Sequence, residues 1–232
     1  MSDSGLDLYV CDPTVGDIVH SKMTTEYDIS TASTYETTFY FDQFNAYPQD
    51  LQINPSSNRM YVLESSGILV EYSISSGRPA TASQIRQIDL NSVIFSTYNY
   101  SAFQISDDGN KLFVAGNGTN NYVFRLDLST AWNISTASYN SNNYQGSLNS
   151  MTGLSIKPDG SSLITVDLNE SLDQIELSTS WDLNTASIVA GSSIIENQDD
   201  NEGGIFIPPD GEKLYYGGTS TDTIYQYSIT MI

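Results

Sequence analysis

The chain has 232 residues, of which 28 are acidic and 8 are basic, so its formal net charge at pH 7 is −20. Nucleic-acid binding requires a basic surface and anionic lipid attracts basic segments, so this charge argues against both kinds of partner. The single cysteine excludes an internal disulfide, and no apolar run reaches the ~18 residues of a membrane span. We therefore expect no nucleic-acid partner and no membrane insertion.

One short apolar cluster recurs five times at almost constant spacing. Its copies begin 52, 52, 51 and 51 positions apart, at Leu8, Met60, Leu112, Leu163 and Leu214. A fixed period of about fifty residues with strand-like content is the sequence signature of a β-propeller. The repeat predicts a single domain over residues 1–232, because propeller blades share a continuous interface and cannot bury their faces alone.

Each repeat predicts four antiparallel strands in chain order. A first strand with alternating apolar residues ends in an Asp-Gly turn, as at residues 159–160, and the apolar cluster after the turn forms the second strand. A third strand follows, and a linker that reads Ile-Ser-Thr-Ala-Ser at 134–138 leads to the fourth. Helical periodicity is nearly absent. Four such strands form one propeller blade.

The two ends depart from this pattern. The first repeat starts at its second strand, and the fifth stops at Ile232 before its linker and outer strand. The expected fold is an all-β, five-bladed β-propeller of four-stranded antiparallel blades with incomplete first and last blades. Its repeats cover approximately residues 1–45, 46–95, 96–147, 148–198 and 199–232. Because an unpaired edge strand invites pairing with another chain, the incomplete blades also suggest a homo-oligomer.

Aromatic residues are the candidate binding residues. Trp132 and Trp181 occupy equivalent places in two linkers, where the first repeat has Tyr27. Such aromatics could stack on sugars at a propeller rim, but a repeated aromatic more commonly packs against the blade edge, and both interpretations stay open. Several tyrosines among many Asn and Ser residues suit a polar binding face, namely Tyr98, Tyr100, Tyr139, Tyr144, Tyr225 and Tyr227.

One acidic loop is a candidate metal site. Asp199, Asp200 and Glu202 precede the first strand of the fifth repeat, and closely spaced oxygen ligands can hold Ca²⁺. The loop lacks the full ligand pattern of an EF-hand, so a solvated acidic loop is the alternative. No other cofactor is expected. The single histidine, His20, falls inside a predicted third strand, where we expect it to face solvent.

The repeat text resembles that of a known group of β-propellers. The closest stretches are Leu-Ser-Thr-Ala-Trp-Asn-Ile-Ser-Thr-Ala-Ser at 128–138 and Pro-Asp-Gly-Glu-Lys-Leu-Tyr-Tyr at 209–216. They look like the propeller repeat of tail-fibre and other structural proteins of bacteriophages and of some bacterial surface proteins. The resemblance covers nearly the whole chain, although Gly-Arg-Pro replaces the linker text at 77–79. The resemblance implies a non-enzymatic virion protein, and it assigns no catalytic residues to this chain.

One functional hypothesis and two rivals follow. The first is a virion protein of tail-fibre, receptor-binding or adhesin type, assembled in the host cytoplasm, that presents a propeller face to a glycan or protein on a host surface. The second is a capsid or tail decoration protein that docks to other virion proteins by its blade edges. The third is a lactonase-like propeller enzyme, whose central channel would be lined by Gln52, Gln104 and Ser155 and would hold few charged ligands.

Overall fold

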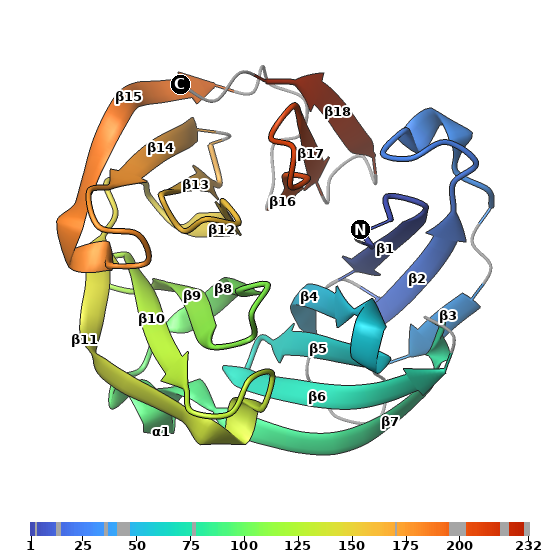
Figure 1. Ribbon diagram of the computed structural model, residues 1–232, viewed down its shortest axis with the longest axis horizontal. Coiled ribbons are helices and arrows are strands. Elements are labelled where there is room, and N and C mark those ends of the chain that lie inside the picture. The colour runs from blue at the N-terminus through green and yellow to red at the C-terminus, as the bar shows by residue number, and fades with distance from the viewer. Residues whose placement is uncertain are drawn as a thin grey trace. The chain divides into compact units, whose positions relative to one another are not determined.

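The computed structural model describes residues 1–2, 4–12, 15–34, 37–40, 47–75, 78–169, 171–194, 203–218 and 223–229. These residues form five small antiparallel sheets, each inside one of the five expected repeats (Figure 1). The fold is a five-bladed β-propeller and is almost entirely β. Among the described residues, blades I and V contain three strands each and blades II to IV contain four, which confirms the expected incomplete first and last blades.

Within every blade, each strand pairs with the next one along the chain. Blade I contains β1 (Asp7–Asp12), β2 (Asp17–Lys22) and β3 (Thr37–Tyr40), and blade II contains β4 (Pro48–Asn54), β5 (Arg59–Glu64), β6 (Ile68–Ser75) and β7 (Arg78–Asp89). Blade III contains β8 (Asn99–Ile105), β9 (Lys111–Asn117), β10 (Tyr122–Leu128) and β11 (Ala137–Gln145). Blade IV contains β12 (Met151–Ile156), β13 (Ser162–Asp167), β14 (Ser171–Leu177) and β15 (Ala186–Ile194). Blade V contains β16 (Gly203–Phe206), β17 (Lys213–Gly218) and β18 (Ile224–Ser228).

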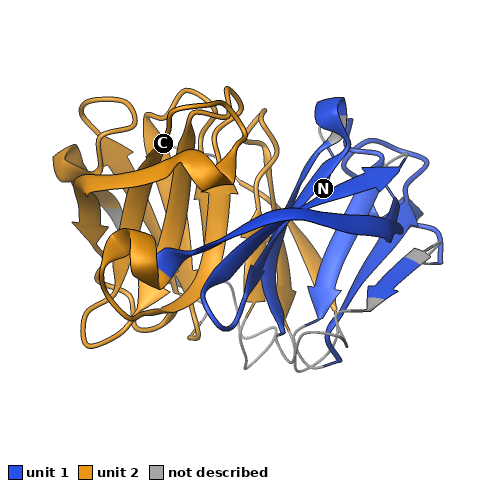
Figure 2. Cartoon of the chain, turned by 90° about the horizontal axis from the view of Figure 1, so that it is seen from below, with its two compact units in different colours: residues 1–90 blue, residues 91–232 orange. Residues whose placement is uncertain are grey.

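The chain divides into two compact units, Met1–Leu90 and Asn91–Ile232 (Figure 2). Unit 1 contains blades I and II, which share one apolar core. The apolar clusters of both repeats supply its centre, because alternate residues of β1, β5 and β6 point into the same space. The buried members are Tyr9, Ile18, Ile53, Met60, Val62, Val70, Tyr72 and Ile74.

Unit 2 contains blades III to V. Their inner strands β8, β12 and β16 pack side by side (Figure 1). An apolar core lies between blades III and IV and includes Phe113, Val123, Leu154 and Ile175. A short α-helix, α1 (Leu90–Ile94), precedes β8, and its five residues are too few to produce a helical stripe in the sequence. No helix in the described part of the chain is long and apolar enough to cross a membrane.

The repeated linkers form short 3₁₀ helices, η1 (Ile29–Thr31), η3 (Ile134–Thr136) and η4 (Leu183–Thr185). Each is capped by the Asp or Asn before it, at 28, 133 and 182, whose side chain accepts a hydrogen bond from a backbone N–H two residues on. The second repeat has no such residue, and there β7 begins at Arg78 and runs through the expected linker. A fourth 3₁₀ helix, η2 (Pro55–Ser57), lies in the turn between β4 and β5.

Candidate functional site

The linker aromatics pack against the turn of their own blade. In each case the aromatic backbone N–H donates at 2.8 Å to the carbonyl of a turn residue: Tyr27 to Gly5, Trp132 to Gly109 and Trp181 to Gly160. All three glycines have positive φ, and a Cβ on any of them would overlap the aromatic ring. The structure therefore favours the packing interpretation of Tyr27, Trp132 and Trp181 over the binding interpretation.

Trp181 also connects blades III and IV. Its ring lies 6.0 Å from that of Phe113, and Lys111 Nζ lies 5.3 Å from the ring centroid. Its carbonyl accepts a hydrogen bond from Arg125 Nη1 at 2.7 Å. Both the ring and the backbone of Trp181 are thus engaged in the interface between two blades.

Other polar side chains of blade III form hydrogen bonds with the backbone and one side chain of blade IV. Gln104 accepts from the backbone N–H of Ile156 at 2.7 Å and donates to its carbonyl at 3.3 Å. Asn142 donates to Asp182 Oδ1 and accepts from the backbone N–H of Leu183. The Gln104 amide, expected in the channel of a lactonase-like enzyme, is therefore directed to the neighbouring blade.

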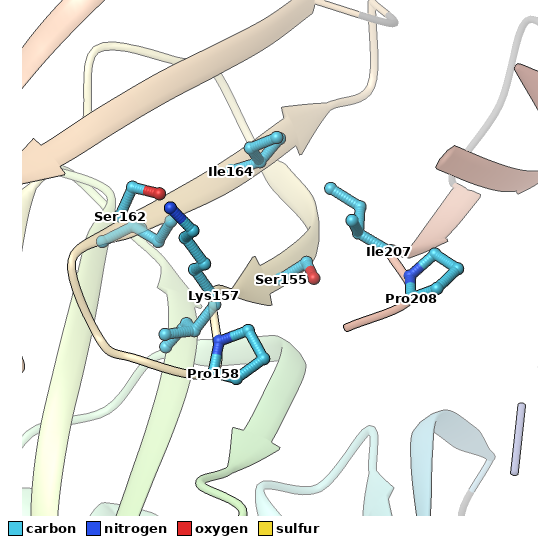
Figure 3. A pocket seen from close by; sticks show the side chains of 9 residues that line it. Ser155, Lys157, Pro158, Ser162, Ile164, Ile207 and Pro208 are labelled. Carbon is cyan, nitrogen blue, oxygen red and sulfur yellow. The ribbon is translucent and has the colours of Figure 1, made fainter. Parts of the chain in front are cut away.

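Two small depressions lie in unit 2 near Lys157 and Pro158. The first, of about 250 Å³ including its open mouth, lies between these residues, Ser155 and Ile164 on one side and Ile207 on the other (Figure 3). The second, of about 190 Å³, lies between blades III and IV and is lined in part by Gln104 and Trp181. Only about 10 Å³ of the first depression and about 0 Å³ of the second can hold the centre of a water molecule, so both fall far below the about 300–1,000 Å³ of usual small-molecule sites.

The expectation for His20 was wrong, because the side chain is 1% exposed. His20 pairs with Tyr9 in the β1–β2 register, and the two rings stack with centroids 4.7 Å apart. His20 Nε2 lies 2.8 Å from Asp7 Oδ1. β2 buries alternate residues, Ile18 and His20, so this position lies on the covered face of the strand.

The expected binding residues Tyr98 and Tyr100 differ in exposure. Tyr100 is 2% exposed, and its hydroxyl donates to the carbonyl of Ser96, so it supports the surface rather than forming part of it. Tyr98 is half-buried. Its backbone N–H donates to Asn91 Oδ1 at 3.3 Å, which ties the start of β8 to helix α1.

Tyr98 is part of a group of aromatic rings on blade III, which we call the tyrosine cluster: Tyr98, Tyr122 and Tyr139 around the buried ring of Phe124. The ring centroids of Tyr98, Tyr122 and Tyr139 lie 5.0, 5.6 and 5.7 Å from that of Phe124. Val123, the residue between Tyr122 and Phe124, packs into the core with blade IV. Because side chains alternate along a strand, Tyr122 and Phe124 lie on the opposite side of β10 from Val123.

The hydroxyl ends of the cluster are close enough to interact electrostatically. Burial raises the pKa of Tyr139, the hydrogen bond from Asn143 opposes this rise, and the nearby Tyr98 and Tyr122 add to it. Asn143 Nδ2 donates to the Tyr139 hydroxyl at 2.7 Å. The cluster therefore presents phenol and amide groups together beside half-buried aromatic rings.

A second amide, Gln145, lies two residues beyond Asn143 at the end of β11. The Tyr122 hydroxyl donates to Gln145 Oε1 at 3.4 Å, and Tyr122 and Gln145 are register partners. A bulge in the β10–β11 ladder places Asn140 and Ser141 as extra residues between two paired positions. The sequence signal for Tyr122, Asn143 and Gln145 was only the high content of Tyr and Asn, because register and bulge decide which of these side chains meet.

The expected calcium ligands Asp199, Asp200 and Glu202 lie outside the described residues. Among the residues that the structure describes, no three His, Cys, Asp or Glu side chains are grouped so that they could hold a metal ion.

Comparisons with known proteins show similarity of fold. No family model matches the chain, and no curated protein matches it. The chain is similar in structure to Sqt1 from Chaetomium thermophilum, with a TM-score of 0.54 and 11% identity over 97% of this chain and 54% of that one. A second match, to the RRP9 WD40 repeats, has a TM-score of 0.47 and 11% identity over 79% of this chain and 52% of that one. The chain thus spans about half the length of both structures, and at this identity the likeness concerns the fold alone.

Proposed function

We propose that this chain is a non-enzymatic recognition protein of a virion, of the receptor-binding or adhesin type, and that it binds a host surface through the tyrosine cluster of blade III. The observation that carries the recognition role is the meeting of Tyr98, Tyr122 and Tyr139 with the amides of Asn143 and Gln145 on one face of the blade. The resemblance of the repeat text to virion propellers supports the virion setting.

The composition of this surface suits recognition. Tyrosine supplies a rigid, amphipathic contact area with few rotatable bonds, and Asn and Ser supply adaptable hydrogen bonds, the combination found in antibody binding sites. The described depressions are smaller than usual ligand pockets, which favours binding on an exposed surface over enclosure of a small molecule.

Binding of the labelled protein to a panel of intact bacterial cells tests this proposal. The wild type should bind at least one strain, and Tyr139→Ala should lose most of that binding while its circular dichroism spectrum stays unchanged. Tyr47→Ala is the matched control, because Tyr47 is 51% exposed and lies in unit 1 outside the cluster. Equal loss in both variants, or no binding by the wild type to any strain, would overturn the proposal.

A further inference from the structure

The region around the tyrosine cluster has little charge in a strongly acidic chain. Residues 90–156 contain three acidic and two basic side chains, a net charge of −1, whereas the whole chain has −20. The charged groups nearest to the cluster along β10 pair with each other, since Arg125 Nη2 lies 3.2 Å from Asp127 Oδ1. The three phenols and two amides of the surface are themselves uncharged.

Both kinds of contact that a sugar ring can make are present here. Tyr98 and Tyr139 offer aromatic rings, which attract the C–H face of a pyranose, and Tyr hydroxyl and Asn or Gln amide groups can each donate and accept hydrogen bonds. The amides are already oriented by the protein: Asn143 is held on the Tyr139 hydroxyl and Gln145 on the Tyr122 hydroxyl. Oriented groups lose less entropy on binding, which favours affinity.

We propose that the ligand of the tyrosine cluster is an uncharged saccharide, which rests on the proposed recognition role and specifies it. An anionic sugar is disfavoured because the chain carries −20 and no cationic side chain belongs to the cluster. A cationic ligand would be attracted by the net charge of the whole chain, and no charged side chain of the cluster would hold it at this surface. An uncharged, polyhydroxylated ligand matches the rings, the hydroxyls and the amides together.

A glycan array that contains neutral, sialylated, sulfated and uronic-acid sugars tests this inference. Binding should be confined to neutral oligosaccharides, and the affinity for the best of them should change less than about twofold between 0.05 and 0.5 M NaCl, since no charges are paired on binding. Tyr139→Ala should weaken binding about tenfold or more, and Tyr139→Phe by a smaller factor, because the latter keeps the ring and removes the hydroxyl. Tyr47→Ala should bind as the wild type does.

Two results would overturn the saccharide inference. The first is binding to anionic sugars alone. The second is binding to cells that survives glycosidase treatment, is lost on protease treatment and still depends on Tyr139. In that case the tyrosine cluster would be a recognition surface for a protein. If neither cells nor sugars bind, the proposed function fails together with the inference. In the two cases above, only the saccharide inference fails, so the two failures are distinguishable.

Discussion

Alanine at Gly160 should destabilise the protein far more than alanine at Gly204. Gly160 has φ +68, where a residue with a Cβ costs about 1–2 kcal/mol, and the new Cβ would also overlap the Trp181 ring. Truncation of a buried Trp costs about 3–5 kcal/mol, and the half-buried Trp181 ring should lose about 2 kcal/mol when it is displaced. The expected loss for Gly160→Ala is therefore about 3 kcal/mol.

A double-mutant cycle isolates the contact between the glycine and the ring. Trp181→Ala alone should cost about 2–3 kcal/mol, and once the ring is gone Gly160→Ala should add only its backbone strain of about 1 kcal/mol. Urea unfolding followed by circular dichroism measures all three variants. Gly204→Ala is the control, because a Cβ there meets nothing within 4 Å, and it should change stability by less than about 0.5 kcal/mol. Additive losses, or a loss at Gly160 no larger than at Gly204, would refute the packing role of the linker aromatic.

Three further predictions concern stability. Asn142→Ala should cost about 2 kcal/mol in urea unfolding, because it leaves the buried backbone N–H of Leu183 without its partner, whereas the exposed Asn140→Ala should cost little. Phe95→Asn should raise stability by about 0.5–1 kcal/mol, since Phe95 is 88% exposed and has φ +59, a conformation that Asn tolerates better; a loss would show that the ring makes a stabilising contact. Hydrogen bonds from Ser161 hold the pKa of Asp159 below its usual value, so the ionised Asp159 carboxylate stabilises the folded state. This contribution to stability is fully present above the unfolded-state pKa and is lost as the pH falls through the lower folded-state pKa. Acid titrations of unfolding should therefore show a smaller loss below about pH 4 for Asp159→Asn than for the wild type.

The repeat and its strands could be predicted from the sequence because they depend on local pattern. Each apolar cluster lies in the strand that the repeat predicts for it. These strands are β1, β5, β9, β13 and β17, which contain Leu8, Met60, Leu112, Leu163 and Leu214. Alternating apolar residues determine a strand, and an Asp-Gly pair determines a turn, through interactions within a few residues. The same local sequence therefore predicts the same strands and turns in each repeat.

The position of individual polar side chains could not be predicted in the same way. His20 was expected to face solvent, but its place in the register directs it onto Tyr9 and into the covered side of β2. The lactonase-like hypothesis would place Gln104 in a channel, but the packing of β8 on β12 brings its amide to the backbone of Ile156. Both outcomes depend on which face of a blade meets its neighbour, which repeat spacing does not specify.

For the candidate binding residues too, the sequence predicts the kind of residue, whereas tertiary pairing decides its contacts. Trp132 was recognised as a repeated aromatic, and its contact with Gly109 explains the repetition by packing. Tyr98 and Tyr139 were recognised from composition, but their meeting around Phe124 requires the β10–β11 register and its bulge. Composition thus indicates the kind of surface, and tertiary pairing decides where it lies.

Hydrogen exchange of the wild-type protein with and without a saturating neutral oligosaccharide, chosen from the array, tests the central claim most directly. The account predicts slower exchange in peptides that cover residues 122–145, which contain β10 and β11. Slower exchange at the turns around residues 106–111 and 157–160, without any change over residues 122–145, would contradict the assignment of the recognition surface to blade III.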